Sequence, residues 1–124
     1  MSQDVAAVDE PAVDFTVVFS DEAGQTVAHI AGEIDIATCG RLRDAIEPQL
    51  GPRQRVVLDL AGVRFMDSAC LHVLVPARTT LTADGGSLIL RNPSPVARRV
   101  LTVAGLADLF ELEHANVELA PETA

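Results

Sequence analysis

The pair Asp67-Ser68 is the part of the sequence best suited to chemistry, because a carboxylate and a hydroxyl stand together at the expected start of a helix. The surrounding stretch, VVLDLAGVRFMDSACLHVLV at 56–75, predicts a buried strand, a glycine turn, a second extended piece and then that helix. Ligands of α/β proteins collect at the carboxyl ends of strands, and a helix start offers unpaired N–H groups to a phosphate. The Ser68 hydroxyl is therefore placed where a phosphate could be accommodated. The alternative is that Ser68 or Asp67 only caps the helix, which contributes about 1 kcal/mol.

Other reactive residues do not form a recognisable centre. The three histidines are far apart in the sequence and have no zinc-like spacing to either cysteine: His29, His72 and His114, with Cys39 and Cys70. We therefore expect no metal and no cofactor. A hydrolytic triad of Ser68, His72 and Asp67 lacks a visible orienting carboxylate and an oxyanion donor pair, so no catalytic residue is assigned.

Cys70 allows two interpretations. A cysteine at this point of a helix is commonly a small buried residue, although a thiol in the first helical turn can have a lowered pKa and sense oxidation. Two cysteines without CxxC spacing need no disulfide and fit a reducing cytosol.

Composition and charge restrict the class of protein. The 124 residues suffice for one domain, and a hydrophobic fraction of 48% is typical of a globular one. The net charge is −9, all nine basic residues lie between 41 and 99, and phenylalanine is the only aromatic residue type, so we expect no nucleic-acid partner. No apolar run is long enough for a membrane helix and the N-terminus has no secretory signal pattern, which favours the cytoplasm and no membrane partner.

The first elements expected along the chain are a hairpin and a helix. Alternating apolar residues from Phe15 and a turn at 21–24 predict a β-hairpin. Apolar residues spaced along one helical face predict a helix over 38–50, closed by Pro48 and Gly51.

The remaining elements alternate strand with helix. Strands are expected at 56–60, 88–90 and 109–112, and helices from 67–68 to about 85 and from Ser94-Pro95 to Gly105. The last helix shows an apolar stripe of Val96, Val100 and Val103. In the preceding helix, which starts at 67–68, Pro76 predicts a kink or an early break. The order β-β-α-β-α-β-α-β predicts an α/β fold, with a mixed sheet opened by the hairpin and helices packed on it.

Two segments resemble the STAS domain of bacterial anti-sigma factor antagonists. In that family a strand ending in Asp-Leu leads through Gly-Val to an Asp-Ser-[Ser/Thr]-Gly-Leu-Gly segment, and Ser68 matches its phosphorylated serine. A Gly-Glu-Leu-Asp segment with a threonine three residues later is matched by Gly32-Glu33-Ile34-Asp35 and Thr38. The resemblance covers about residues 13–115 and implies a single STAS-like domain at 12–115, between a flexible acidic leader at 1–11 and an acidic tail at 116–124. Within the motif, Ala69 replaces the second hydroxyl residue, and Cys70 and His72 replace the two glycines.

The resemblance also implies a function. The protein would be a non-enzymatic regulator whose unphosphorylated form binds an anti-sigma factor with serine kinase activity and releases sigma factor. Phosphorylation of Ser68 would weaken the complex, and a phosphatase would reverse it. The residues expected to bind the partner flank Ser68 in the two motifs: Glu33, Asp35, Thr38, Asp67, Ala69, Cys70 and His72.

Alternatives remain open at several of these positions. Asp35 is equally suited to cap the first helix, and Glu33 to lie on the surface at a strand end. For the whole chain, the alternative is a STAS-like scaffold or accessory module that is not phosphorylated, and a third hypothesis is a redox-responsive binder that uses Cys70.

Overall fold

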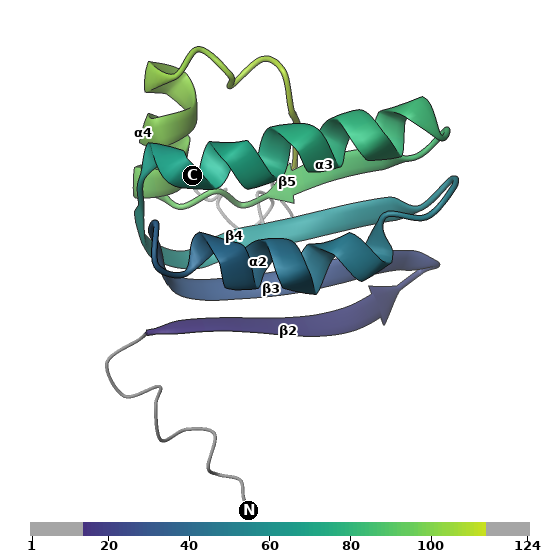
Figure 1. The fold of residues 1–124 in the computed structure, drawn as a ribbon, viewed down its shortest axis with the longest axis horizontal. Helices are drawn as coiled ribbons and strands as arrows, with labels where there is room; N and C mark the ends of the chain where they lie inside the picture. Colours follow the sequence, from purple (N-terminus) through teal and green to yellow (C-terminus); the bar gives the residue numbers. More distant parts are fainter. Residues whose placement is uncertain (1–13, 114–124) are drawn as a thin grey trace, which may run out of the picture.

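The structure, a computed structural model, describes residues 14–113 and consists of one five-stranded sheet with three α-helices (Figure 1). The strands lie in the order β2-β3-β4-β5-β6 across the sheet. Their bounds, and those of the helices between them, are β2 Phe15–Glu22, β3 Gln25–Ile34, α2 Cys39–Ile46, β4 Arg55–Met66, α3 Leu71–Ala83, β5 Ser87–Arg91, α4 Pro95–Val103 and β6 Glu111–Glu113. The predicted order of elements and the α/β class are confirmed. The expected leader and tail lie outside the described residues.

The opening hairpin forms as the turn signal predicts. Strands β2 and β3 pair antiparallel from Phe15 opposite Gly32 to Glu22 opposite Gln25. The two turn residues, Ala23 and Gly24, both have positive φ angles, which is the geometry of tight two-residue hairpin turns.

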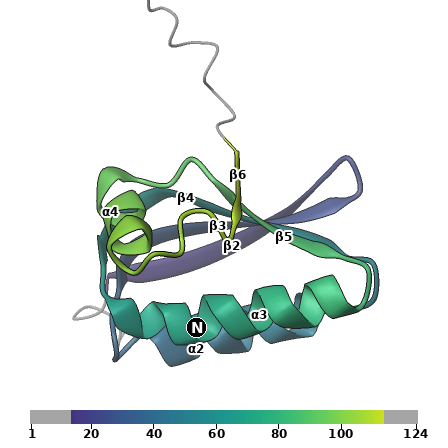
Figure 2. The same ribbon diagram turned by 90° about the horizontal axis from the view of Figure 1, so that it is seen from above.

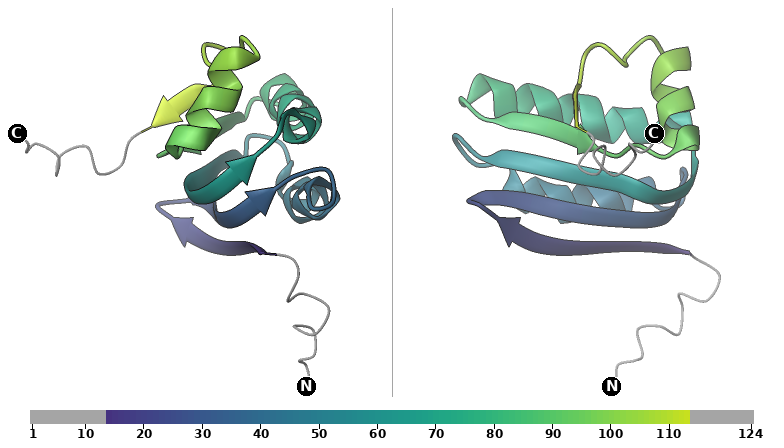
Figure 3. Two further views of the ribbon diagram at one scale, coloured as in Figure 1. Left: turned by 90° about the vertical axis from the view of Figure 1, so that its left-hand side faces the viewer. Right: turned by 180° about the vertical axis from the view of Figure 1, so that it is seen from behind.

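The strands from β3 to β6 pair in parallel, and a helix connects each of them to the next along the chain. Figures 2 and 3 show α2 and α3 side by side on one face of the sheet, with α4 at the end where the parallel strands finish. The main hydrophobic core fills the space between the sheet and the helices and includes Leu58, Leu74 and Leu90. A small second cluster, Val27, Val57 and Ile89, lies among strand residues that point to the opposite face.

Strand β4 differs from the prediction. The expected glycine turn after Leu60 is wrong, because β4 continues through Gly62 to Met66 as one strand. Two register shifts against β3 absorb the extra residues, so that His29 faces Asp59 but Ala31 faces Gly62. A Cβ atom at Gly62 would lie 2.9 Å from the Cβ of Ala31, so the irregular segment requires glycine there.

Helix α3 also differs, because the break expected at Pro76 does not occur and the helix runs on to Ala83. Proline deprives the His72 carbonyl of its helical N–H partner. His72 and Pro76 both lie on the exposed side of α3, where water can solvate that carbonyl. The first helix is shorter than expected, since α2 ends at Ile46 and a 3-10 helix, Glu47–Gln49, follows.

Helix α4 begins as predicted, with the Ser94 hydroxyl accepting a hydrogen bond from the Ala97 N–H (3.3 Å) and Pro95 in the first turn. Its predicted inward stripe is wrong at one position. Val103 is 78% exposed, and the fully buried face is formed by Ala97 and Leu101, one helical turn apart. Within residues 14–113, no helix is long and apolar enough to span a membrane.

Candidate functional site

The two motifs meet where β3 and β4 end side by side. Ile34 pairs with Met66, and the N–H of Asp67 donates to the carbonyl of Ile34 at 3.1 Å. The loops that follow the two strands, starting at Asp35 and Asp67, therefore leave the same edge of the sheet.

The loop after β3 is held by Asp35 and Thr38. The Asp35 carboxylate accepts hydrogen bonds from the N–H groups of Ala37 (2.9 Å) and Thr38 (3.1 Å). The Thr38 hydroxyl accepts from the Asp35 N–H and donates to the Glu33 carbonyl, both at 2.9 Å. Thr38 is only 4% exposed, so its side chain supports the loop from within and does not form the surface.

Gly32 fixes where this loop begins. Its φ is +101°, a conformation that side chains rarely adopt, and a Cβ atom there would collide with the backbone carbonyl of Asp14. The next N–H, that of Glu33, donates to the same Asp14 carbonyl at 2.7 Å. Glycine in the Gly-Glu-Ile-Asp segment thus allows β2 and β3 to approach closely just before Asp35.

The loop after β4 presents Ser68. Asp67 has extended backbone angles, and its carboxylate accepts a hydrogen bond from the Ala69 N–H at 2.8 Å. Asp67 therefore caps the 3-10 helix Ser68–Cys70, which leads directly into α3. Ser68 is exposed, and its hydroxyl makes no hydrogen bond to any residue in 14–113. The capping role that the sequence left open between the two residues belongs to Asp67, which leaves the serine hydroxyl available.

Cys70 lies behind this loop in the core. It is completely buried, and burial together with the charge of Asp67 raises the pKa of its thiol to about 12. Of the two interpretations of this cysteine, the structure supports the small buried residue, because the loss of solvation raises the thiol pKa. The redox hypothesis therefore loses its physical basis at this cysteine.

His72 lines a different hollow from that of Ser68. It lines a hollow of about 110 Å³ between α2 and α3, together with Arg43, Leu50 and Thr80. The structure places no hydrogen bond between His72 and Ser68, so nothing in residues 14–113 assembles the hydrolytic arrangement considered from the sequence.

Ser68 instead faces α4. It lines a hollow of about 330 Å³ with Arg99, Val100, Val103 and Ala104. No local sequence signal predicts this contact, because Arg99 is 31 positions away and its helix packs here only through the chain's topology. Two further exposed apolar side chains lie near the same strand ends, Ile36 (79%) directly after Asp35 and Phe65 (45%) in β4, two residues before Asp67.

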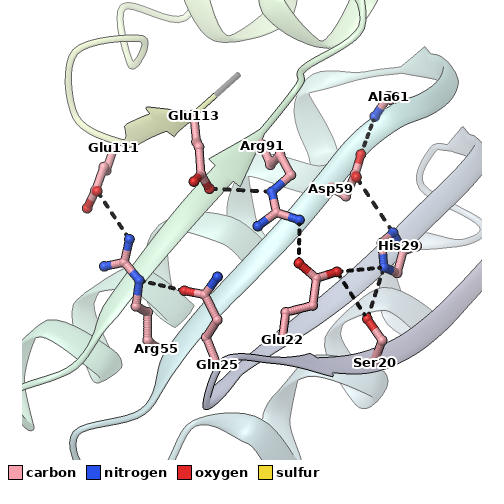
Figure 4. A network of polar contacts seen from close by, with 10 residues as sticks. All are labelled: Ser20, Glu22, Gln25, His29, Arg55, Asp59, Ala61, Arg91, Glu111 and Glu113. Atoms are coloured by element: carbon pink, nitrogen blue, oxygen red, sulfur yellow. Dashed lines mark hydrogen bonds and ion pairs between the residues drawn. The ribbon is translucent and has the colours of Figure 1, made fainter. Parts of the chain in front are cut away.

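A separate polar network lies on the face opposite α2 and α3 (Figure 4). Arg91 bonds Glu22 at 3.1 Å and Glu113 at 3.4 Å, and Asp59 accepts from the Ala61 N–H at 3.0 Å. No group of three or more histidine, cysteine or acidic residues in the described chain could hold a metal ion.

Comparison with known proteins identifies the family. The STAS domain family matches residues 15–122, and the chain belongs to that family. The anti-sigma-B factor antagonist of Listeria monocytogenes is 33% identical over 92 residues, which are 73% of this chain and 80% of the relative. The crystal structure of an anti-sigma factor antagonist from Mycobacterium paratuberculosis superposes with a TM-score of 0.72 at 29% identity, covering 80% of this chain and 85% of the other. The phosphorylated form of the Bacillus cell fate determinant SpoIIAA superposes with a TM-score of 0.63 at 25% identity, covering 88% and 97%.

Proposed function

We propose that this protein is an anti-sigma factor antagonist that acts in the cytoplasm and is regulated by phosphorylation of Ser68. Its unphosphorylated form binds an anti-sigma factor with serine kinase activity, and sigma factor is released. Relatives that carry this name, 33% identical to the chain, support the proposal. The observation that carries it is the exposed Ser68 hydroxyl, unbonded within residues 14–113, on a loop that Asp67 holds in place.

In this reaction the chain contributes only the hydroxyl group that accepts the phosphoryl group. The Ser68 oxygen attacks the γ-phosphorus of ATP, the bond from that phosphorus to the β,γ-bridging oxygen breaks, and ADP leaves. The hydroxyl proton passes to a base of the kinase, which also holds ATP and Mg²⁺. A phosphatase then hydrolyses the serine phosphate and restores the binding form.

The partner surface proposed around Ser68 combines charge and apolar area. Asp35 and Asp67 supply carboxylates at the ends of β3 and β4, while Ile36 and Phe65 add exposed apolar side chains beside them. Glu33, near the end of β3, and Ala69, in the 3-10 helix after β4, are half-buried. Apolar anchors surrounded by charged groups are typical of protein interfaces, with the charges giving specificity.

Phosphorylation weakens binding in this account through charge. A serine phosphate adds about −1.5 to −2 charges beside Asp67. At an interface, an added charge that lacks an opposite partner loses its solvation and repels nearby carboxylates. A tenfold loss of affinity requires only about 1.4 kcal/mol, which one such charge can exceed.

A second candidate is a STAS scaffold or accessory module that is not phosphorylated, and the altered motif favours it. Two of the three replaced motif positions, however, do not lie directly beside Ser68. Cys70 is buried and fills the core, and His72 faces the hollow between α2 and α3. Ala69 alone lies directly beside the serine, and a methyl group there leaves the hydroxyl accessible.

Kinase labelling tests the two candidates. The full chain is incubated with candidate anti-sigma factor kinases and ATP, and the products are analysed by intact mass and peptide mapping. We expect one phosphate, located at Ser68 and absent from Ser68→Ala, while Thr79→Ala, which alters another exposed hydroxyl, is labelled like the parent. Binding of an anti-sigma factor without labelling by any kinase would support the scaffold instead, and a phosphate at another residue would reject the assignment of Ser68.

A further inference from the structure

The hollow beside Ser68 joins the proposed phosphorylation site to one face of α4. Four residues of the helix and its end complete the lining, and among them Arg99 is the only cation. The others, Val100, Val103 and Ala104, are apolar, and Val103 is 78% exposed. A group attached to Ser68 therefore extends over an apolar floor with one positive charge at its side.

Arg99 is available to such a group. It is exposed, and its guanidinium forms no ion pair or hydrogen bond with any residue in 14–113. The carboxylate next to Ser68 is that of Asp67. It accepts a hydrogen bond from the Ala69 N–H and does not line the hollow. A phosphate on Ser68 would add negative charge next to Asp67 in a protein whose net charge is −9, and Arg99 is the cation that lines the same hollow.

We propose that Arg99 is an intramolecular phosphate-binding residue that engages the phosphoserine formed at position 68. The proposal rests on the proposed phosphorylation of Ser68. The planar guanidinium can donate two parallel hydrogen bonds to phosphate oxygens, an arrangement that lysine cannot reproduce.

The contact has a consequence for the partner surface. With phosphate and guanidinium bonded across the hollow, the two side chains cover Val100 and Val103 and withdraw that apolar floor from any partner. Phosphorylation then acts in two ways, by adding charge beside Asp67 and by closing the hollow against α4.

The test measures the ionisation of the phosphate itself. Phosphoserine is incorporated at position 68 of the full chain during translation, so that no kinase is needed, and its phosphorus NMR signal is followed against pH. A nearby cation favours the dianion, so we expect the second phosphate pKa to be lower than in Arg99→Gln by about half a unit, the size appropriate to an exposed ion pair. Arg98→Gln is the matched control: it removes an adjacent exposed arginine that does not line the hollow, and it should leave the titration unchanged.

A second readout follows the arginine. The Arg99 side-chain N–H resonance should shift between the serine and phosphoserine proteins, and that of Arg98 should not. Identical phosphate titrations in the parent and Arg99→Gln proteins, or an equal effect of Arg98→Gln, would overturn the proposal. Because the phosphate is built in, failure of every kinase to label Ser68 would reject the proposed function without affecting this result.

Discussion

The Asp35 carboxylate accepts hydrogen bonds that hold its loop, and it also carries a negative charge. Two substitutions separate the effect of the hydrogen bonds from the effect of the charge. Its carboxylate accepts from the N–H groups of Ala37 and Thr38, so Asp35→Ala should lower the free energy of unfolding by about 1 kcal/mol, the usual cost of losing a cap. Asp35→Asn keeps an acceptor oxygen and should cost clearly less. If the charge contacts the anti-sigma factor, both variants weaken binding by a similar factor.

Thermal melts and calorimetric titration of the two Asp35 variants check this. A binding loss confined to Asp35→Ala would mean that the partner reads the shape of the loop and not the carboxylate.

Cys70 should be inert in the folded protein. Its thiol is buried with a pKa of about 12, so almost none is thiolate at pH 8, and iodoacetamide should modify the half-buried Cys39 first. The raised pKa also sets a pH dependence. Above the ordinary thiol pKa the unfolded state loses this proton while the native state keeps it, so stability falls as pH rises from about 9 towards 12.

Mass spectrometry of briefly alkylated protein, with Cys39→Ser as the control, measures the first effect. Rapid modification of Cys70 in the native Cys39→Ser protein would show that α3 opens readily and would contradict the packing described above.

At the scale of elements, Arg91 connects the two edges of the sheet. From β5 it bonds Glu22 at the end of β2 and Glu113 in β6 (Figure 4). Burial by itself lowers the pKa of this guanidinium, but hydrogen bonds and charges from Glu22 and Glu113 outweigh that effect and raise the pKa above its ordinary value. The Arg91 side chain is 10% exposed while both carboxylates are about 40% exposed, so the cation is the more buried partner.

We therefore expect Arg91→Met to lower the free energy of unfolding by roughly 1 to 3 kcal/mol, below the full cost of breaking a completely buried pair. Arg98→Met, at an exposed site, should change it by less than about 0.5 kcal/mol. Chemical denaturation of both variants measures the difference, and equal stabilities would mean that Arg91 contributes nothing to joining the edges.

The elements could be predicted from the sequence where local chemistry decides them. The hairpin turn, the alternation of strands and helices, and the Ser94-Pro95 helix start all depend on a few adjacent residues. The errors arose where tertiary packing decides. Gly62 does not turn the chain because β3 continues to pair with β4, and Val103 is exposed because Ala97 and Leu101 form the face of α4 that packs into the core. The proximity of Arg99 to Ser68 depends on the whole topology and leaves no local signal.

At the scale of the whole molecule, phosphorylation of Ser68 should leave the fold intact. Ser68 is exposed, and its hydroxyl makes no hydrogen bond within residues 14–113 that phosphorylation would break. The core begins at the buried Cys70, two residues further along the chain. Backbone NMR should show shifts confined to 33–38, 65–72 and the α4 residues around Arg99. Shifts spread through the distant hairpin turn at Ala23 and Gly24 would indicate a conformational switch instead.

We expect the surface around Ser68 to bind an anti-sigma factor only while this serine is unmodified. The most direct test is calorimetric titration of the cognate anti-sigma factor with the unmodified protein and with protein carrying phosphoserine at position 68, under identical salt conditions. The phosphoserine protein should bind at least tenfold more weakly, a difference of about 1.4 kcal/mol or more. Equal affinities of the two forms would contradict it.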